Sequence, residues 1–299
     1  MKNPPFVSIV VPSFKTEATI ARTLQSLVDQ DYPRLQIIVI DGGSPDGTAH
    51  AVEPFLPHLD VWLSEPDRGQ THALNKGFRI ADGDLYGWLC ADDQLEPGAI
   101  WRLVEEFARR PEADLITGGC RRDFNGAFEV ITAPDPRFAE RLAFVNTIEQ
   151  PSTLWRAELH HTAGPLDESY RYAMDWEFWR RMQAKGGVFR SVPEVLSTYY
   201  FSDDNLTSSG GRKIADEMAR IIKTYGPYNG RLARIYQSLY KRFDLKGFYD
   251  PDAAERISGW RRAWHHMVLR WLYWRYDRET IDAYNWNFCS RLERGLGWS

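Results

Sequence analysis

The sequence predicts an α/β protein with a mostly parallel sheet and helices on both faces. Short apolar segments alternate with segments whose apolar residues recur at helical spacing, as expected for parallel strands joined by right-handed crossovers. Each expected strand also ends at a polar residue, and ligands bind open α/β sheets at the edge where such strand ends meet. The four expected strands are residues 6–11, 35–40, 59–63 and 85–90.

The first expected strand, residues 6–11, is rich in β-branched residues, which is typical of a strand buried on both faces. Pro12 ends it. Thr16 is a candidate N-cap for a helix over residues 17–30, whose apolar residues fall at helical spacing and which Pro33 follows.

The second expected strand ends at Asp41, where the turn-rich loop 42–47 begins. A helix follows and is expected to end near Phe55. The third strand leads through loop 64–69 into a helix over residues 70–81. In the second half we expect strands at 113–117, 128–132 and 196–201, and a helix over 176–184.

Composition excludes several classes of protein. The chain has 299 residues, a formal net charge of −4 and 43% hydrophobic residues, as in a globular protein that does not bind nucleic acid through bulk charge. Its 3 cysteines are widely spaced, which indicates neither a disulfide framework nor a zinc site and fits a reducing compartment. We expect no signal peptide and no transmembrane helix, and therefore a cytoplasmic location.

The end of the chain differs in composition from the rest. Residues 229–299 carry 13 Lys and Arg against 8 Asp and Glu, a net charge of +5, whereas the remainder stands at −9. Half of the 12 tryptophans also lie in this segment. We therefore expect a domain boundary near Gly226-Pro227.

Two adjacent carboxylates, Asp92 and Asp93, follow the fourth expected strand. Charge just past the end of a buried strand is costly unless something compensates it. Mg²⁺ is usually held by one or two carboxylates plus substrate phosphates, so the pair is a candidate cation site. The alternative is a solvated turn before a helix that starts near Glu96-Pro97.

Two common nucleotide-binding loops are missing. Loop 42–47 does not match the G-x-G-x-x-G fingerprint and follows the second strand rather than the first. No G-x-x-x-x-G-K-[ST] loop occurs either. Both observations disfavour a nicotinamide or ATP phosphate cradle.

A series of short motifs runs through the first third of the chain. They are Val7-Ser8-Ile9-Val10-Val11-Pro12-Ser13-Phe14 with Glu17, Ile38-Val39-Ile40-Asp41-Gly42-Gly43-Ser44, Ser64-Glu65-Pro66-Asp67-Arg68-Gly69-Gln70, Ala73-Leu74-Asn75-Lys76-Gly77 and Ala91-Asp92-Asp93. This series closely resembles the family 2 glycosyltransferases of bacterial type, over roughly residues 6–210.

The resemblance implies a GT-A fold, which has a Rossmann-like, mostly parallel sheet with helices on both faces. It also implies a sugar-nucleotide donor, Mn²⁺ or Mg²⁺ as cofactor, and an inverting displacement. The expected organisation is a catalytic domain over 1–226, with a nucleotide-binding half to about 118 and an acceptor half over 119–226. A helical, amphipathic C-terminal extension would span 227–299.

Carried over by position, the resemblance assigns the nucleotide site. Pro12, Ser13 and Phe14 would line the base pocket, and Glu17 would lie near the nucleoside. Asp41 would accept a hydrogen bond from the base ring NH, as uracil or thymine offers. Alternatively, Pro12 simply ends a strand and Glu17 favours a helix N-terminus.

The resemblance extends this site to the next two loops. Asp67 and Arg68 would flank the nucleotide, while Asn75 and Lys76 would face the cleft. Lys76 on a solvated helix face is the alternative. At the end of the fourth strand, Asp92 would contact ribose or donor sugar, and Asp93 would hold the metal against the diphosphate.

The acceptor side carries weaker signals. Gln150 belongs to a Gln-Pro-Ser segment that is similar to one in a bacterial subset of the family, so Gln150 and Trp155 are candidate substrate contacts. Ordinary loop packing is the alternative. Many relatives carry a His after the strand at 196–201, whereas this chain has Ser202-Asp203-Asp204-Asn205 there, so we assign no metal ligand in that segment.

Asp175 aligns with the carboxylate that acts as general base in the family. An acceptor hydroxyl that attacks the anomeric carbon must lose its proton, so the chemistry needs such a group. The alternative for Asp175 is a plain N-cap for the helix over 176–184. Glu177 would be the second candidate base, and Trp176 and Glu177 are candidate substrate contacts.

The C-terminal segment, residues 229–275, carries two helical stripes of aromatic residues with Arg and Lys nearby. A basic, Trp-rich amphipathic helix can lie in a membrane interface, which would suit a lipid-linked acceptor at the inner face of the cytoplasmic membrane. Docking on the catalytic domain or on a second subunit is the alternative.

The sequence therefore predicts an inverting, metal-dependent hexosyltransferase that takes a nucleotide sugar, with UDP-sugar favoured, to a saccharide or lipid-linked acceptor in bacterial polysaccharide or glycolipid biosynthesis. A catalytically inactive scaffold of the same fold is the main alternative. A sugar-1-phosphate nucleotidyltransferase would need a Gly-rich, Arg-containing N-terminal loop that is missing here. The sequence leaves open whether the chain forms a homo-oligomer.

Overall fold

The computed structural model describes residues 3–124, 127–131, 138–143, 145–201, 211–226, 230–235, 237, 259–278 and 280–281. Contacts within the chain divide it into two compact units. One comprises Met1–Ala139 and Thr147–Ser202, and the other comprises Glu140–Asn146 and Asp203–Ser299.

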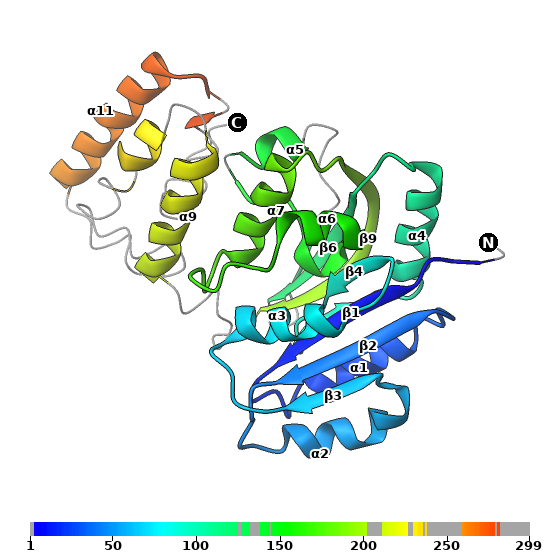
Figure 1. Cartoon of the computed structure of the whole chain (residues 1–299). Helices are drawn as coiled ribbons and strands as arrows, with labels where there is room; N and C mark the ends of the chain where they lie inside the picture. Colours follow the sequence, from blue (N-terminus) through cyan, green and yellow to red (C-terminus); the bar gives the residue numbers. More distant parts are fainter. Residues whose placement is uncertain are drawn as a thin grey trace. The chain divides into compact units, whose positions relative to one another are not determined.

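The first unit is built on one sheet with the strand order β3-β2-β1-β4-β8-β6-β9-β5, and β7 pairs with β6 outside this path. The strands β3, β2, β1 and β4 are parallel and lie side by side in Figure 1. The strands are β1 (Val7–Ser13), β2 (Leu35–Asp41), β3 (Val61–Ser64), β4 (Leu85–Trp88), β5 (Gln94–Leu95), β6 (Leu115–Phe124), β7 (Ala127–Ile131), β8 (Thr153–Arg156) and β9 (Phe189–Phe201).

The second half of the sheet is mixed, because β8 runs antiparallel to both β4 and β6. The α/β class predicted from the sequence is confirmed, with the parallel half in the part of the chain that carries the motifs. Pro12 extends β1 rather than ending it: it pairs with Ile40 of β2, whereas β4 pairs only with Val7–Val10 on the other side.

Helices cover this sheet between the strands. Those of the first unit and its boundary are α1 (Ile20–Val28), α2 (Thr48–Val52), α3 (Gln70–Ile80), α4 (Ala99–Arg109), α5 (Phe138–Arg141), α6 (Ala157–Ala163) and α7 (Met174–Ala184), with 3₁₀ turns η1 (Glu53–His58) and η2 (Gln150–Ser152).

Alternation along β1 divides the core between two faces. Val7, Ile9 and Val11 pack in a cluster with apolar residues of α1 and α4. Val10 faces α3, where Gly77 lets helix and strand approach closely: a Cβ on Gly77 would lie 2.3 Å from Val10 Cγ1.

Two helix boundaries differ most from the prediction, by three residues each. The first helix begins at Ile20, because the Thr16 carbonyl accepts hydrogen bonds from Thr19 and Ile20 and closes a separate turn. The second helix ends at Val52 and continues as the 3₁₀ turn η1, which contains Pro57. Proline lacks the N–H that an α-helix requires at that position.

The second unit contains α9 (Gly211–Tyr225) and α11 (Gly259–Arg275). α9 packs on the segment that follows it: Lys223 Nζ donates to Gln237 Oε1 at 2.8 Å, and Gln237 Nε2 donates to Asp216 at 2.6 Å. Contacts thus group α9 with the C-terminal part of the chain, whereas composition favoured a boundary near Gly226. No helix in the part of the chain that the structure describes is long and apolar enough to cross a bilayer.

Candidate active site

Asp41, at the end of β2, ties together the loops that follow three strands. Its carboxylate accepts hydrogen bonds from the backbone N–H of Gly43 and Ser44, at 3.1 and 2.9 Å, and from the Ser44 hydroxyl at 2.5 Å. The Ser64 hydroxyl after β3 donates at 2.6 Å, and Ser13 at the end of β1 donates a longer bond of 3.4 Å. Asp41 is buried and fixes the edge where the nucleotide was expected.

An exposed aromatic ring and a carboxylate meet above this edge. A Cβ on Gly42 would lie 2.9 Å from Asp67 Oδ2 and 3.2 Å from Phe14 Cδ2, so the three residues converge closely. Phe14 is 55% exposed, whereas Pro12 and Ser13 are buried. Glu17 accepts a hydrogen bond from the Gly47 N–H at 2.5 Å and so joins the loops after β1 and β2.

The other predicted nucleotide ligands form contacts within the protein. The Asn75 side chain forms two 2.9 Å hydrogen bonds, one with the N–H and one with the carbonyl of Leu166. Lys76 is buried and pairs with Glu65 at 2.9 Å, and Arg68 pairs with Glu168 at 2.6 Å. In this structure Asn75 and Lys76 thus hold neighbouring segments of the protein.

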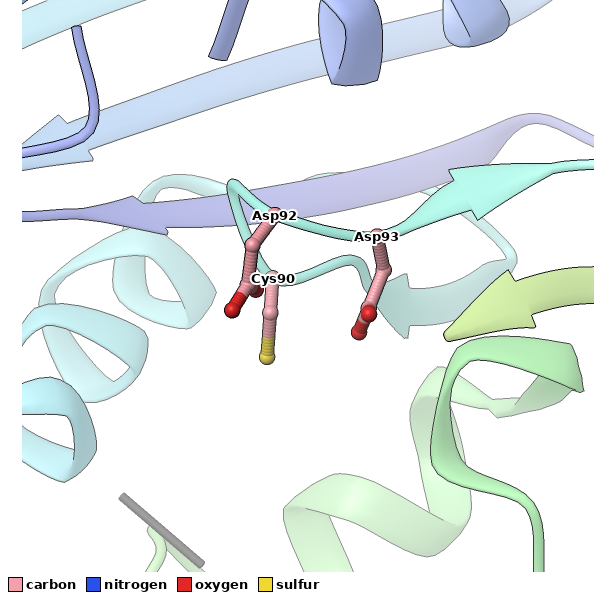
Figure 2. A group of neighbouring side chains, drawn as sticks. All are labelled: Cys90, Asp92 and Asp93. Carbon is pink, nitrogen blue, oxygen red and sulfur yellow. The ribbon is translucent and has the colours of Figure 1, made fainter. Parts of the chain in front are cut away.

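Cys90, Asp92 and Asp93 form a cluster after β4. Their ligand atoms all lie within 4.8 Å of one another, and Figure 2 shows the three side chains pointing to the same side of the loop. Asp93 is 1% exposed, and its Oδ1 atom has no hydrogen-bond partner among the residues that the structure describes. Arg22 and Thr23 of α1 position this loop by donating to the carbonyls of Asp92 and Asp93 at 2.9 and 2.7 Å.

The cluster holds three buried or half-buried acidic groups, and the positive charge beside them does not balance the two carboxylates. Burial raises the pKa of Asp92, and burial together with the Asp92 charge raises the pKa of Asp93 well above its usual range. Burial also raises the pKa of the Cys90 thiol, and the charges of Asp93, Asp92 and Asp175 add to that rise. A buried carboxylate oxygen without a hydrogen-bond partner, close to two further ligand atoms, fits a divalent cation.

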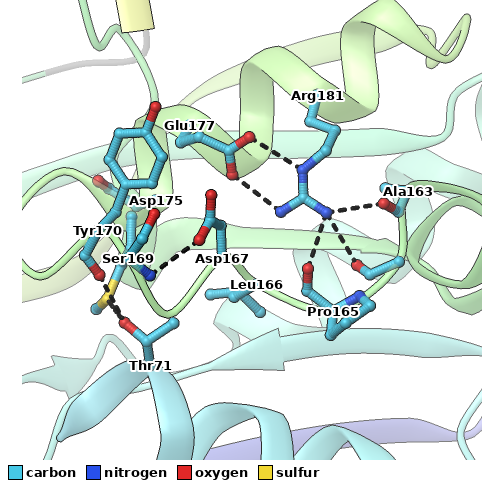
Figure 3. Close-up of polar contacts among 12 residues, drawn as sticks. Thr71, Ala163, Pro165, Leu166, Asp167, Ser169, Tyr170, Asp175, Glu177 and Arg181 are labelled. Atoms are coloured by element: carbon cyan, nitrogen blue, oxygen red, sulfur yellow. Dashed lines mark hydrogen bonds and ion pairs between the residues drawn. The ribbon is translucent and has the colours of Figure 1, made fainter. Parts of the chain in front are cut away.

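Asp175 lies at the start of α7, within electrostatic reach of Cys90. Its Oδ1 accepts the N–H of Trp176 at 2.7 Å. The Thr71 hydroxyl of α3 donates to the Tyr170 carbonyl at 3.1 Å, which links the start of α3 to the segment that precedes α7 (Figure 3). Asp175 therefore lies near the loop that carries Cys90, Asp92 and Asp93.

Gln150 also reaches the cluster. Its Nε2 donates to the Trp88 carbonyl at 2.6 Å, and the Cys90 thiol lies 3.6 Å from its Oε1. Trp155 and Trp176 do not reach the cluster, and these residues are 0% and 1% exposed. Trp155 packs edge-on against Trp88 and Trp179. Both indoles lie in the core, which favours the packing alternative over a substrate contact.

Sequence reasoning missed three residues of this site. Cys90 is two positions from Asp92, and that spacing was the available signal. Gln70 donates to Cys90 Sγ at 3.0 Å, and Glu168 holds Arg68 from 100 positions away in the chain. Local sequence carries no signal for the last pairing. The segment 202–210, where a further metal ligand was left unassigned, lies outside the described residues.

Similar solved structures confirm the GT-A fold. The chain is similar to the mannosyltransferase PcManGT from Pyrobaculum calidifontis in complex with GDP-Man and Mn²⁺, with 20% identity, a TM-score of 0.62, and coverage of 94% of this chain and 85% of that one. S. aureus TarS 1-349 in complex with UDP-GlcNAc matches with 17% identity, a TM-score of 0.58, and coverage of 98% and 93%.

The chain belongs to glycosyl transferase family 2, whose family model matches residues 8–164. The PGL/p-HBAD biosynthesis glycosyltransferase of Mycobacterium bovis is 30% identical over 205 residues, which cover 65% of this chain and 77% of that protein. An uncharacterized glycosyltransferase of Haemophilus influenzae is 25% identical over 311 residues, which cover 95% of this chain and 90% of that one. The family predicted from the motifs is thereby confirmed.

Proposed function

We propose that this protein is an inverting, metal-dependent glycosyltransferase of the hexosyltransferase type, which moves a sugar from a nucleotide sugar to an acceptor hydroxyl. The observation that supports this most is the convergence at one sheet edge of an exposed ring, an orphaned buried carboxylate and a second carboxylate. These are Phe14, Asp93 and Asp175.

In this proposal the nucleoside occupies the edge between Phe14 and Asp67. The exposed Phe14 ring offers a face for stacking a base, and the absence of a side chain on Gly42 leaves Asp67 and Phe14 close together. Pro12, Ser13 and Glu17 support this edge from below. Asp41 would gain a base ring NH most easily in exchange for its weakest bond, the 3.4 Å contact from Ser13.

Asp93 and Asp92 would hold the cation, Mn²⁺ or Mg²⁺, because the positive charge near the two carboxylates does not balance their negative charge. When bound, the cation would supply Lewis-acid stabilisation for the leaving diphosphate. Asp92 would in addition contact ribose or donor sugar. Arg68, held by Glu168, would flank the nucleotide, and Gln150 would face the donor from beside Cys90.

Asp175 is the proposed general base. The acceptor hydroxyl oxygen forms a bond to the anomeric carbon while the bond from that carbon to the diphosphate oxygen breaks, and Asp175 takes the hydroxyl proton. The attack comes from the face opposite the leaving group, so the configuration inverts. Glu177 is the weaker candidate, because both of its oxygens are held by Arg181 at 3.0 and 2.9 Å.

The relatives favour a bacterial polysaccharide or glycolipid as the acceptor pathway. One relative is named for PGL/p-HBAD biosynthesis, and a Staphylococcus epidermidis relative that matches 38% of this chain is a poly-beta-1,6-N-acetyl-D-glucosamine synthase. The structural neighbours are in complex with UDP-GlcNAc or with GDP-Man. We keep UDP, which the sequence favours, as the proposed nucleotide, and the experiment below tests which base the protein binds.

We also propose that α11 rests on an anionic membrane surface, at the inner face of the cytoplasmic membrane. Trp260, Met267, Trp271 and Trp274 are 68%, 58%, 48% and 79% exposed, and their spacing places them on one face of the helix. Leu269 and Leu272 are buried on the other side, and the helix contains no acidic residue.

The charges beside this exposed stripe suit anionic lipid. Arg270 and Arg275 are exposed and, at 100° per residue, fall on opposite sides of the tryptophans. A stripe of Trp between cationic side chains is typical of helices that lie in the lipid interface. A homo-oligomer that covers the same stripe is the competing arrangement.

A thermal-shift panel tests the proposed donor. UDP, dTDP, GDP, CMP, ATP and NAD are each added with and without Mn²⁺, and a ligand that binds the native state raises the melting temperature. The proposal expects one nucleoside diphosphate to shift the melting temperature mainly with metal present. If only NAD shifts the melting temperature, or if no nucleotide does, the proposed donor is contradicted and only the assignment of the fold stands. Binding without turnover of any donor would favour an inactive scaffold.

A further inference from the structure

A thiol borders the candidate cation site. Cys90 lies two residues before Asp92, and its sulfur is within 4.8 Å of the carboxylate oxygens of Asp92 and Asp93. The thiol points to the same side of the loop as the two carboxylates (Figure 2). The cluster also holds the buried Asp93 Oδ1 atom, which has no partner in the structure. An unsatisfied buried acceptor beside a thiol offers ligands for a metal cation.

We propose that Cys90 Sγ is a direct ligand for a thiophilic divalent cation at Asp92 and Asp93, so that the site binds Zn²⁺ or Cd²⁺ more tightly than Mg²⁺. Thiolate ligands select soft cations, whereas Mg²⁺ takes oxygen ligands. On binding, the sulfur–metal bond forms and the thiol proton leaves to solvent. This inference rests on the metal site of the proposed function.

The spacing suits shared coordination. Zinc–sulfur and zinc–oxygen bonds are about 2.3 and 2.0–2.2 Å long, so two ligands of one tetrahedral ion lie about 3.6 Å apart. The ligand atoms lie within 4.8 Å of one another, so side-chain shifts of about 1 Å bring them to this separation.

Two glutamine side chains hold the sulfur in place. Gln70 Nε2 donates to Cys90 Sγ at 3.0 Å, and the thiol lies 3.6 Å from Gln150 Oε1. Gln150 is itself fixed by its 2.6 Å bond to the Trp88 carbonyl. The sulfur thus faces the carboxylates in a fixed position before any cation arrives.

A matched control is present in the chain. Cys120 is a second buried thiol, but its sulfur contacts the Arg121 carbonyl at 3.3 Å and belongs to no cluster of ligand atoms among the described residues. Metal binding that depends on a thiol at this site should therefore be lost when Cys90 is replaced and retained when Cys120 is replaced.

The test is a titration of the full chain with Cd²⁺, followed through the ultraviolet charge-transfer band of a thiolate–cadmium bond. Wild type and Cys120→Ala should show the band, and Cys90→Ser and Cys90→Ala should lack it. Loss of a direct ligand should weaken Cd²⁺ binding at least as much as the roughly 10- to 100-fold that outer partners of a metal site contribute. Asp93→Asn should weaken it as well.

An unchanged band or unchanged Cd²⁺ affinity in Cys90→Ser would overturn the inference, as would the absence of a band in wild type. Circular dichroism of each variant confirms folding. Mn²⁺-dependent nucleotide binding, measured in the same samples, separates the two proposals. If that binding is intact while the cadmium band is unaffected by Cys90→Ser, the Cys90 inference fails alone; if wild type binds no nucleotide, the proposed function fails.

Discussion

Glu177 and Arg181, one turn apart on α7, form two hydrogen bonds of 3.0 and 2.9 Å between carboxylate and guanidinium. Arg181 Nη1 also donates to the carbonyls of Ala163 and Pro165, each at 2.8 Å (Figure 3). Glu177 is buried. The pair therefore fixes the loop between α6 and α7, and Glu177 is already committed to a structural partner.

This arrangement separates the roles of the two acidic residues of α7. Asp175→Asn should lower kcat about 10²- to 10⁴-fold, the range that a general base contributes, with nucleotide affinity retained. Glu177→Gln should retain much more of kcat but lower the free energy of unfolding by about 1–3 kcal/mol, because Arg181 loses a charged partner. Steady-state kinetics and urea unfolding on both variants check this, and full activity in Asp175→Asn would remove it as the base.

Asp41 should contribute strongly to stability, because five donors from three loops converge on its carboxylate. Asp41→Asn replaces an acceptor by an amide N–H₂ facing other donors and should cost about 2–3 kcal/mol in urea unfolding. Asp82→Asn, at an exposed position, is the control and should stay within about 0.5 kcal/mol of wild type. Equal stability of the two variants would contradict this role.

His160 should make the fold sensitive to acid. It lies among Phe78, Tyr86 and Phe178, and burial, with the charges of His161 and Arg181, lowers its pKa from 6.5 to about 4. The unfolded chain therefore takes up a proton below pH 6.5 that the folded chain refuses until about pH 4. This stabilising contribution is complete above pH 6.5 and is lost as the pH falls, by about 3 kcal/mol in total.

Unfolding by urea at several pH values between 7 and 4 measures this effect. His160→Gln should show a smaller loss of stability over that interval than wild type. His58→Gln, at an exposed position away from this cluster, is the control and should follow the wild-type curve. If the free energy of unfolding falls equally with pH in wild type and in His160→Gln, another group causes the loss of stability at low pH.

Much of the parallel half of the sheet could be predicted from the sequence, because the signals for its strands are local. The run from Val7 to Val11 can only be a buried strand, and Asp41 or Asp93 at a strand end must lie at the sheet edge. The family motifs added the GT-A fold and the expected roles of the residues. The helix at 70–81 was placed to within one residue of α3.

The tertiary partners of the site could not be predicted. Asn75 was assigned to the cleft, but its amide pairs with Leu166, and Lys76 pairs with Glu65. Trp155 became a candidate contact because it follows the Gln-Pro-Ser segment, yet it lies in the core, and its indole N–H has no hydrogen-bond partner among the described residues. Contacts between residues about 90 positions apart leave no periodicity or spacing in the chain.

The exposed stripe of α11 gives a prediction for lipid binding. Wild type should bind vesicles that contain phosphatidylglycerol, and the combined Trp260→Ser, Trp271→Ser and Trp274→Ser variant should bind at least about tenfold more weakly, because apolar burial drives interfacial binding. High salt should weaken binding by wild type. Phe128→Ser, which removes a 61% exposed ring from β7, is the control in a vesicle flotation assay.

Two results would contradict this placement of α11. Wild type could fail to float with anionic vesicles, or the triple variant could float as well as wild type does. Sedimentation equilibrium of both proteins tests the competing arrangement, since a tryptophan stripe that forms a dimer would give a smaller mass in the triple variant.

The most direct test of the account is the calorimetric titration of UDP, or of the diphosphate that the nucleotide panel selects, into wild type and Asp93→Asn, each with and without Mn²⁺. The buried, unpartnered oxygen of Asp93 is the expected link between cation and diphosphate. The account predicts binding to wild type that strengthens at least about tenfold with Mn²⁺, and no metal effect in Asp93→Asn. Equal Mn²⁺ dependence in both proteins would contradict the assignment of the cation site to Asp93.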